Sequence, residues 1–95
     1  MLAVIRYDVQ AEQAGRLQEV YPQHRAYLDL FAKGGDLLLI GTLENPVKNG
    51  SLAVFRSKDA AERFVHADPF VLEGLVEPHV LEWNALEFLD LSTTG

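Results

Sequence analysis

Residues 37–55 read LLLIGTLENPVKNGSLAVF, two short apolar runs separated by a polar segment. The runs at 37–40 and 51–55 have the length and composition of strands. Gly41 follows the first run, and Asn49-Gly50 is a turn sequence typical of hairpins. The segment therefore predicts a pair of consecutive strands at the centre of the chain.

The chain before this pair of strands predicts a strand and then a helix. Leu2 to Tyr7 is rich in apolar and β-favouring residues, and Asp8 should end this first strand. Residues 11–21 have a weak helical pattern. Pro22 suits the first turn of a stronger helix, where its missing N–H would have no partner, and Gly34-Gly35 should end that helix.

The chain after the central strands predicts a second helix and a last strand. Ser57 is a suitable N-cap for a helix that carries Phe64 on its apolar face. Asp68-Pro69 should stop this helix, because proline disfavours helical geometry in the residue before it. After one further helical turn, residues 76–88 read as a strand and residues 89–95 as a fraying tail.

Strand, helix, strand, strand, helix, strand is the ferredoxin-like β-α-β-β-α-β order of an α+β protein. In this fold the helices cover one face of an antiparallel sheet and leave the other face free. We expect a single domain over residues 1–95. By analogy with related folds, we also expect a homodimer or larger homo-oligomer that buries the free face.

The composition narrows the classes of function. The chain has 14 Asp and Glu against 8 Lys and Arg, a net charge of −6 that disfavours nucleic-acid binding. It has no cysteine, which excludes disulfides, thiolate nucleophiles and cysteine-ligated zinc. No signal peptide or membrane span is recognisable, so we expect a soluble cytoplasmic protein.

His24 and Asp68 should meet at one end of the sheet. His24 lies near the start of the first helix, on the stripe that carries Tyr27 and Leu28, and Asp68 lies at the end of the second helix. The two helices run in opposite directions, so these positions share one rim. A carboxylate beside an imidazole fixes the tautomer and stabilises the imidazolium, which suits general acid–base catalysis.

Both residues also have purely structural interpretations. Asp68 followed by Pro69 is the sequence of an N-cap with proline at the first helical position. His24 could be a half-buried helix residue bonded to a backbone carbonyl. The residue pattern alone leaves both interpretations open.

The chain resembles the YCII-related family of small dimeric α+β barrel proteins. The resemblance covers residues 2–88 and rests on a first strand ending in Asp8, PQHRAYL at 22–28, glycines 35, 41 and 50, ADPF at 67–70 and GLV at 74–76. It implies a ferredoxin-like protomer, an oligomer and a pocket with a His–Asp pair, which falls on His24 and Asp68. A dehydrochlorinase-type lyase acting on a chlorinated aromatic is among the family's known activities.

Five further residues near the same rim are candidate substrate contacts: Tyr7, Arg16, Tyr21, Gly41 and Ser51. Phenols and a guanidinium suit a polar aromatic or carboxylate ligand, and glycine permits close backbone approach. Packing, solvated charge and hairpin geometry would explain these residues as well.

The remaining histidines do not suggest a metal site. His66 should be exposed, and His79 has no evident partner. Their spacing is not that of metal ligands, so we predict neither a catalytic metal nor a cofactor.

The leading hypothesis is a small cofactor-independent enzyme that uses His24, oriented by Asp68, for elimination or isomerisation of a small cyclic or aromatic metabolite. One alternative is a non-catalytic module that binds a small ligand. A second is an accessory subunit whose free sheet face docks a larger partner.

Overall fold

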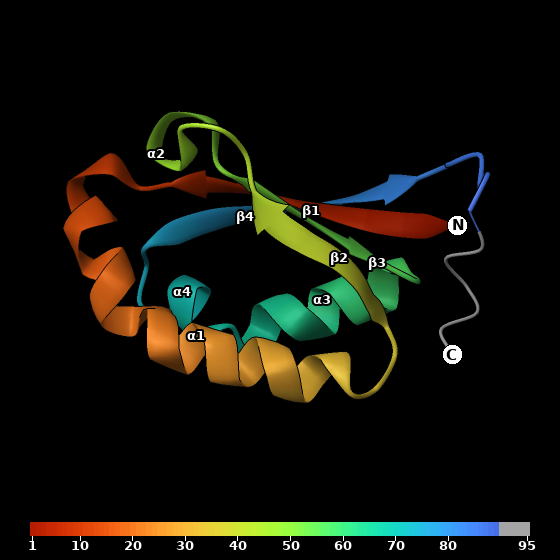
Figure 1. Cartoon of the computed structure of the whole chain (residues 1–95), viewed down its shortest axis with the longest axis horizontal. Coiled ribbons are helices and arrows are strands. Elements are labelled where there is room, and N and C mark those ends of the chain that lie inside the picture. Colours follow the sequence, from red (N-terminus) through yellow and green to blue (C-terminus); the bar gives the residue numbers. More distant parts are fainter. Residues whose placement is uncertain (90–95) are drawn as a thin grey trace.

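The computed structural model describes residues 1–89. Its elements in chain order are β1 (Leu2–Val9), a 3₁₀ helix η1 (Ala11–Arg16), α1 (Leu17–Ala32), β2 (Leu37–Thr42), α2 (Pro46–Asn49), β3 (Ser51–Phe55), α3 (Lys58–Ala67), α4 (Pro69–Leu72) and β4 (Val76–Trp83). The strands form one antiparallel sheet in the order β2-β3-β1-β4. Figure 1 shows α1, α3 and α4 together on one side of this sheet. The predicted ferredoxin-like α+β fold is confirmed.

The core lies between the sheet and the helices. Ile5 and Tyr7 alternate along β1 with more exposed residues and point toward the helices, as expected for a strand with one covered face. Phe55 of β3 and Phe64 of α3 are fully buried, with ring centroids 5.3 Å apart. Ser57 caps α3 as predicted, since its hydroxyl accepts a hydrogen bond from the Ala60 amide at 3.1 Å.

The opposite face of the sheet carries a mostly apolar surface without a covering helix, which we call the free sheet face. The register pairs Val4 of β1 with Val54 of β3 and with Leu81 of β4, so these side chains share that face. Together with Leu52 and Trp83 they line a shallow hollow.

Two predicted strand ends were wrong, and sheet pairing explains both. β1 continues past Asp8, because Val9 still pairs with Val76. β4 ends at Trp83 rather than at residue 88. Trp83 pairs with Leu2, the first residue of β1, so the strand beyond it has no neighbour to bond.

Two helical predictions also differ from the structure. Pro22 lies inside α1 instead of in its first turn, so the Gln18 carbonyl lacks the usual N–H donor. The helix begins earlier than predicted and buries Val20, one turn before the middle of α1, in the core. The segment between β2 and β3, expected to be only a turn, contains the short helix α2. Asn45, the residue before α2, has the left-handed backbone conformation.

His79 has a partner, contrary to expectation. Its Nε2 lies 2.9 Å from Asp8 Oδ2, and Arg6 Nη1 lies 2.6 Å from Asp8 Oδ1. Partial desolvation acts to raise the pKa of Asp8, but the hydrogen bonds and charges of Arg6 and His79 outweigh it and lower this pKa below 3.8. His66 is exposed, as predicted. Most of the predicted fraying tail, from residue 90 onward, lies outside the described residues.

Candidate active site

The break between α3 and α4 sets the position of Asp68. Pro69 disfavours helical geometry in the residue before it, and Asp68 has extended φ/ψ angles of −67° and 120°. Its side chain turns back to accept a hydrogen bond from the Phe70 amide at 3.1 Å, which caps α4. The structural interpretation of Asp68 as an N-cap is therefore correct.

The same carboxylate also holds His24. His24 Nδ1 lies 2.8 Å from Asp68 Oδ1, and the Tyr7 hydroxyl donates to Asp68 Oδ2 at 3.2 Å. Asp68 is fully buried and His24 is 8% exposed, so solvent contributes little to this network. The capping role and the pairing with His24 are compatible, because the two carboxylate oxygens offer several acceptor positions.

The hydrogen bonds indicate the tautomer of His24. Asp68 accepts from the Phe70 amide and from the Tyr7 hydroxyl, so it is the acceptor toward the imidazole as well. His24 Nδ1 then carries the proton, and in the neutral ring Nε2 is the basic nitrogen. This arrangement leaves Nε2 for a proton transfer with a bound molecule.

Phe70 holds the plane of the imidazole. Its ring stacks on His24 with centroids 4.0 Å apart and an interplanar angle of 8°. Residues 68–70 therefore constrain His24 twice, by a hydrogen bond at its edge and by an aromatic ring over its face. The role of Phe70 was missed in the sequence, where its place directly after Asp-Pro was the available signal.

Tyr7 is a neutral phenol in this site. Burial raises the pKa of Tyr7 well above its usual value, and the nearby Asp68 charge and hydrogen bond raise it further. The hydroxyl therefore keeps its proton and remains a donor to Asp68.

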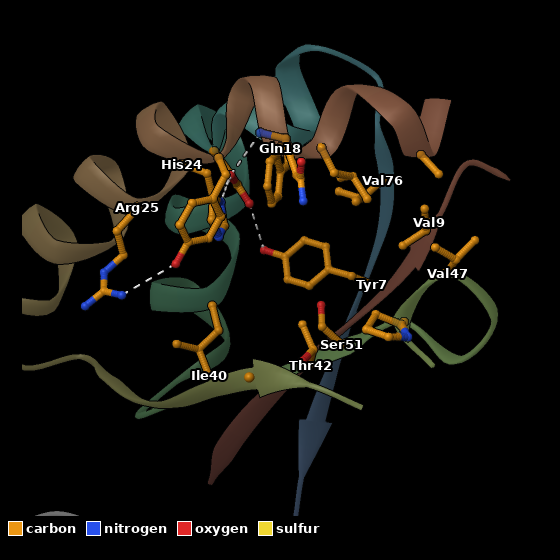
Figure 2. Close-up of a pocket in the computed structure, with 18 of the residues that line it drawn as sticks. Tyr7, Val9, Gln18, His24, Arg25, Ile40, Thr42, Val47, Ser51 and Val76 are labelled. Atoms are coloured by element: carbon orange, nitrogen blue, oxygen red, sulfur yellow. Dashed lines mark hydrogen bonds and ion pairs between the residues drawn. The ribbon is translucent and has the colours of Figure 1, made fainter. Parts of the chain in front are cut away.

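A cavity of about 930 Å³ adjoins the His24–Asp68 pair, and its lining residues include members of α1, of α2 and of the strands β1, β2 and β3. Apolar side chains of β1, α1, β2 and α2 form most of its wall, including Val9, Leu28, Ile40 and Val47. Figure 2 shows Tyr7, Thr42 and Ser51 on the sheet side and His24 across from them on α1. The volume and the few polar groups are typical of a small-molecule pocket.

Six of the seven residues singled out in the sequence line this cavity: Tyr7, Tyr21, His24, Gly41, Ser51 and Asp68. Arg16 is not among the lining residues, and its guanidinium forms an ion pair with Glu73 at 3.0 Å. Besides Phe70, the lining includes Gln18, Arg25 and Thr42, which the sequence analysis did not single out. Gln18 lies in the first turn of α1, three residues before Tyr21 and seven before Arg25, and Thr42 follows Gly41, so spacing was the available signal.

Within residues 1–89, no group of three or more His, Asp or Glu side chains could jointly hold a metal ion. No helix in that part of the chain has the length and apolar character needed to cross a membrane.

Among solved structures, two similar chains are bacterial enzymes. A 5-chloro-2-hydroxyhydroquinone dehydrochlorinase, TftG from Burkholderia phenoliruptrix AC1100 in complex with 2,5-dihydroxybenzoquinone, has a TM-score of 0.69 and 23% identity, covering 88% of this chain and 94% of its own. SnoaB, a cofactor-independent oxygenase from Streptomyces nogalater, has a TM-score of 0.49 and 21% identity, covering 94% and 95%. The first likeness shows a shared fold.

Comparison with curated proteins found no match. The sequence profile of the YCII-related domain, by contrast, matches residues 1–84, nearly all of the described chain. The protein belongs to the YCII-related family.

Proposed function

We propose that this protein is a small enzyme that works without a cofactor and uses His24 as a general acid–base, oriented by Asp68. The substrate would be a small cyclic or aromatic molecule bound in the 930 Å³ cavity. The observation that carries the proposal is the buried His24–Asp68 pair at the wall of that cavity.

The chemistry follows from the tautomer. His24 Nε2 takes a proton from the bound molecule, and the Asp68 carboxylate stabilises the imidazolium that forms. The imidazolium then returns the proton, either to a departing group in an elimination or to another atom in an isomerisation. General acid–base catalysis of this kind contributes roughly 10²–10⁴-fold in rate.

Three residues of the lining are proposed to contact the substrate: Tyr21, Gly41 and Ser51. Tyr21 lies beside His24 with ring centroids 6.1 Å apart, so its phenol can face the same molecule. Ser51 offers a hydroxyl from the sheet side, and Gly41 offers backbone without a side chain in the way.

The test is a screen of small cyclic and aromatic compounds, including hydroxyquinones, with wild type, His24→Ala and His66→Ala. His66 is an exposed histidine on α3 and serves as the matched control. We expect turnover by wild type and by His66→Ala, and a loss of at least about 10²-fold in His24→Ala. Turnover that is unchanged in His24→Ala would refute the mechanism.

A second candidate function, ligand binding without catalysis, is supported by the size and apolar wall of the cavity. If the protein only binds its ligand, a compound that binds to saturation should be recovered chemically intact after prolonged incubation with wild type. Conversion of that compound would favour the enzyme.

We also propose a homodimer formed through the free sheet face. Leu81 and Trp83 are large apolar side chains that remain exposed on that face of the single chain. Sedimentation equilibrium should give a dimer for wild type and a monomer for Leu81→Glu. A monomeric wild type would contradict this arrangement.

A further inference from the structure

We propose that Tyr7 is a positioning residue whose hydroxyl locks the Asp68 carboxylate and thereby fixes the tautomer and orientation of His24. This inference rests on the proposed acid–base role of His24. It assigns Tyr7 a different task from the substrate contact that the sequence suggested.

The two carboxylate oxygens of Asp68 accept hydrogen bonds from different groups. Oδ1 accepts from both His24 and the Phe70 amide, at 2.8 and 3.1 Å. Oδ2 receives the Tyr7 hydroxyl at 3.2 Å. Because Asp68 is fully buried, loss of the Tyr7 hydroxyl would leave Oδ2 without that hydrogen-bond donor. The carboxylate could then turn to seek another partner and would no longer hold His24 in one geometry.

Tyr7 is itself held from several directions. It lies on β1, an inner strand of the sheet, paired with Ser51 on β3 and with Pro78 on β4, and it is only 3% exposed. Gly50 packs directly against the Tyr7 carbonyl, so closely that a Cβ at Gly50 would overlap it. Gly50 also has a φ of +82°, a backbone conformation that residues other than glycine rarely adopt. The turn before β3 therefore fixes the backbone from which the phenol reaches Asp68.

The Tyr7 phenol is suited to positioning Asp68 rather than to transferring protons. Figure 2 shows its hydroxyl directed away from Ser51 and Thr42, along the dashed hydrogen bond rather than toward the sheet side of the cavity. Burial and the Asp68 charge keep the pKa of Tyr7 high, so the group stays protonated and always donates. A group with these properties can order its neighbour without exchanging protons during the reaction.

The experiment is ¹⁵N NMR of the histidine rings in the ligand-free protein, comparing wild type, Tyr7→Phe and Tyr27→Phe. Tyr27 is the matched control, because its hydroxyl also donates a hydrogen bond, at 2.8 Å to the Phe64 carbonyl, but donates none to Asp68. We expect His24 to show the Nδ1–H tautomer alone in wild type and in Tyr27→Phe. In Tyr7→Phe the Nε2–H tautomer should appear beside it. A Tyr7→Phe spectrum identical to wild type would overturn the proposal.

A measurement on wild type covers the case in which Tyr7→Phe does not fold. The buried Tyr7 hydroxyl proton should exchange slowly enough with water to be observed and should give a nuclear Overhauser effect to the His24 Nδ1 proton. A hydroxyl that exchanges too fast to be seen would overturn the proposal. Neither measurement uses a substrate, so a failure here is distinct from unchanged turnover in His24→Ala, which would refute the proposed function alone.

Discussion

Replacing Asp68 by asparagine should separate the two roles of this residue. The amide oxygen of asparagine can occupy the position of Oδ1, because the Phe70 amide needs an acceptor there and His24 Nδ1 can donate to the same atom. The amide nitrogen then faces the Tyr7 hydroxyl oxygen, which can accept a hydrogen bond. Asp68→Asn therefore keeps the cap and the contact with His24 and removes only the negative charge.

The magnitude of the lost charge follows from the geometry. The 2.8 Å contact between Nδ1 and Oδ1 places the centres of the two delocalised charges about 4 Å apart. At an effective dielectric constant near 20, an imidazolium and a carboxylate at that distance attract by about 4 kcal/mol. If the imidazolium forms in the transition state, removing this attraction raises the activation free energy by about 4 kcal/mol, which corresponds to about a 10³-fold decrease in kcat.

The assay pairs steady-state kinetics on a substrate of wild type with urea unfolding. We expect Asp68→Asn to lose about 10³-fold in kcat while its free energy of unfolding changes by only about 1 kcal/mol. Asp68→Ala, the companion variant, should lose about 3 kcal/mol of stability as well, since it removes the cap and leaves the Tyr7 hydroxyl unpaired. Wild-type kcat in Asp68→Asn would refute the electrostatic argument. Equal destabilisation of the two variants would refute the capping argument.

Three further predictions concern single contacts. Gly50→Ala should lower the free energy of unfolding in urea by about 3 kcal/mol or more, since it adds an overlap with the neighbouring strand to the strain of a positive φ. Gly74→Ala is the control, because Gly74 has a φ of +72° and open space around it, and it should cost only about 1–2 kcal/mol. Equal costs would contradict the overlap. The lowered pKa of Asp8 means that its contribution to stability is present above pH 3.8 and is lost as the pH falls through the folded-state pKa, so Asp8→Asn should show a weaker loss of stability with acid than wild type in thermal melts between about pH 5 and pH 2. Phe70→Leu should retain the fold by circular dichroism but lower kcat by about tenfold, because the stacked ring no longer holds the plane of His24, and an unchanged kcat would show that the hydrogen bond to Nδ1 is sufficient.

The topology of this chain was predictable because periodicity and turn residues mark its elements clearly. The order of elements then brought His24 and Asp68 to one rim, and they are in contact although 44 residues separate them. Local pattern did not reveal that one carboxylate would both cap α4 and hold His24. Capping depends on neighbouring residues, whereas the bond to His24 depends on how α1 packs against α4.

What the sequence did not yield depends on strand register. The pairing of His79 with Asp8 requires β1 and β4 to be adjacent and aligned so that Arg6 faces His79. The end of β4 at Trp83 has the same origin, since nothing in residues 84–88 themselves stops a strand. Arg16 illustrates a third case, because its ion pair with Glu73 depends on where two separate helical turns lie in space.

The four-residue helix α4 gives the site a built-in cooperativity. Residues 68–70 supply both the acceptor for His24 Nδ1 and the ring that covers its face, and the cap that begins α4 uses the same Oδ1 atom. A fluctuation that unwinds this one turn would release the imidazole from both constraints at once rather than loosen it gradually. The hydrogen-exchange protection of the amides in α4 would therefore measure how often His24 loses both contacts, independently of whether the sheet remains folded.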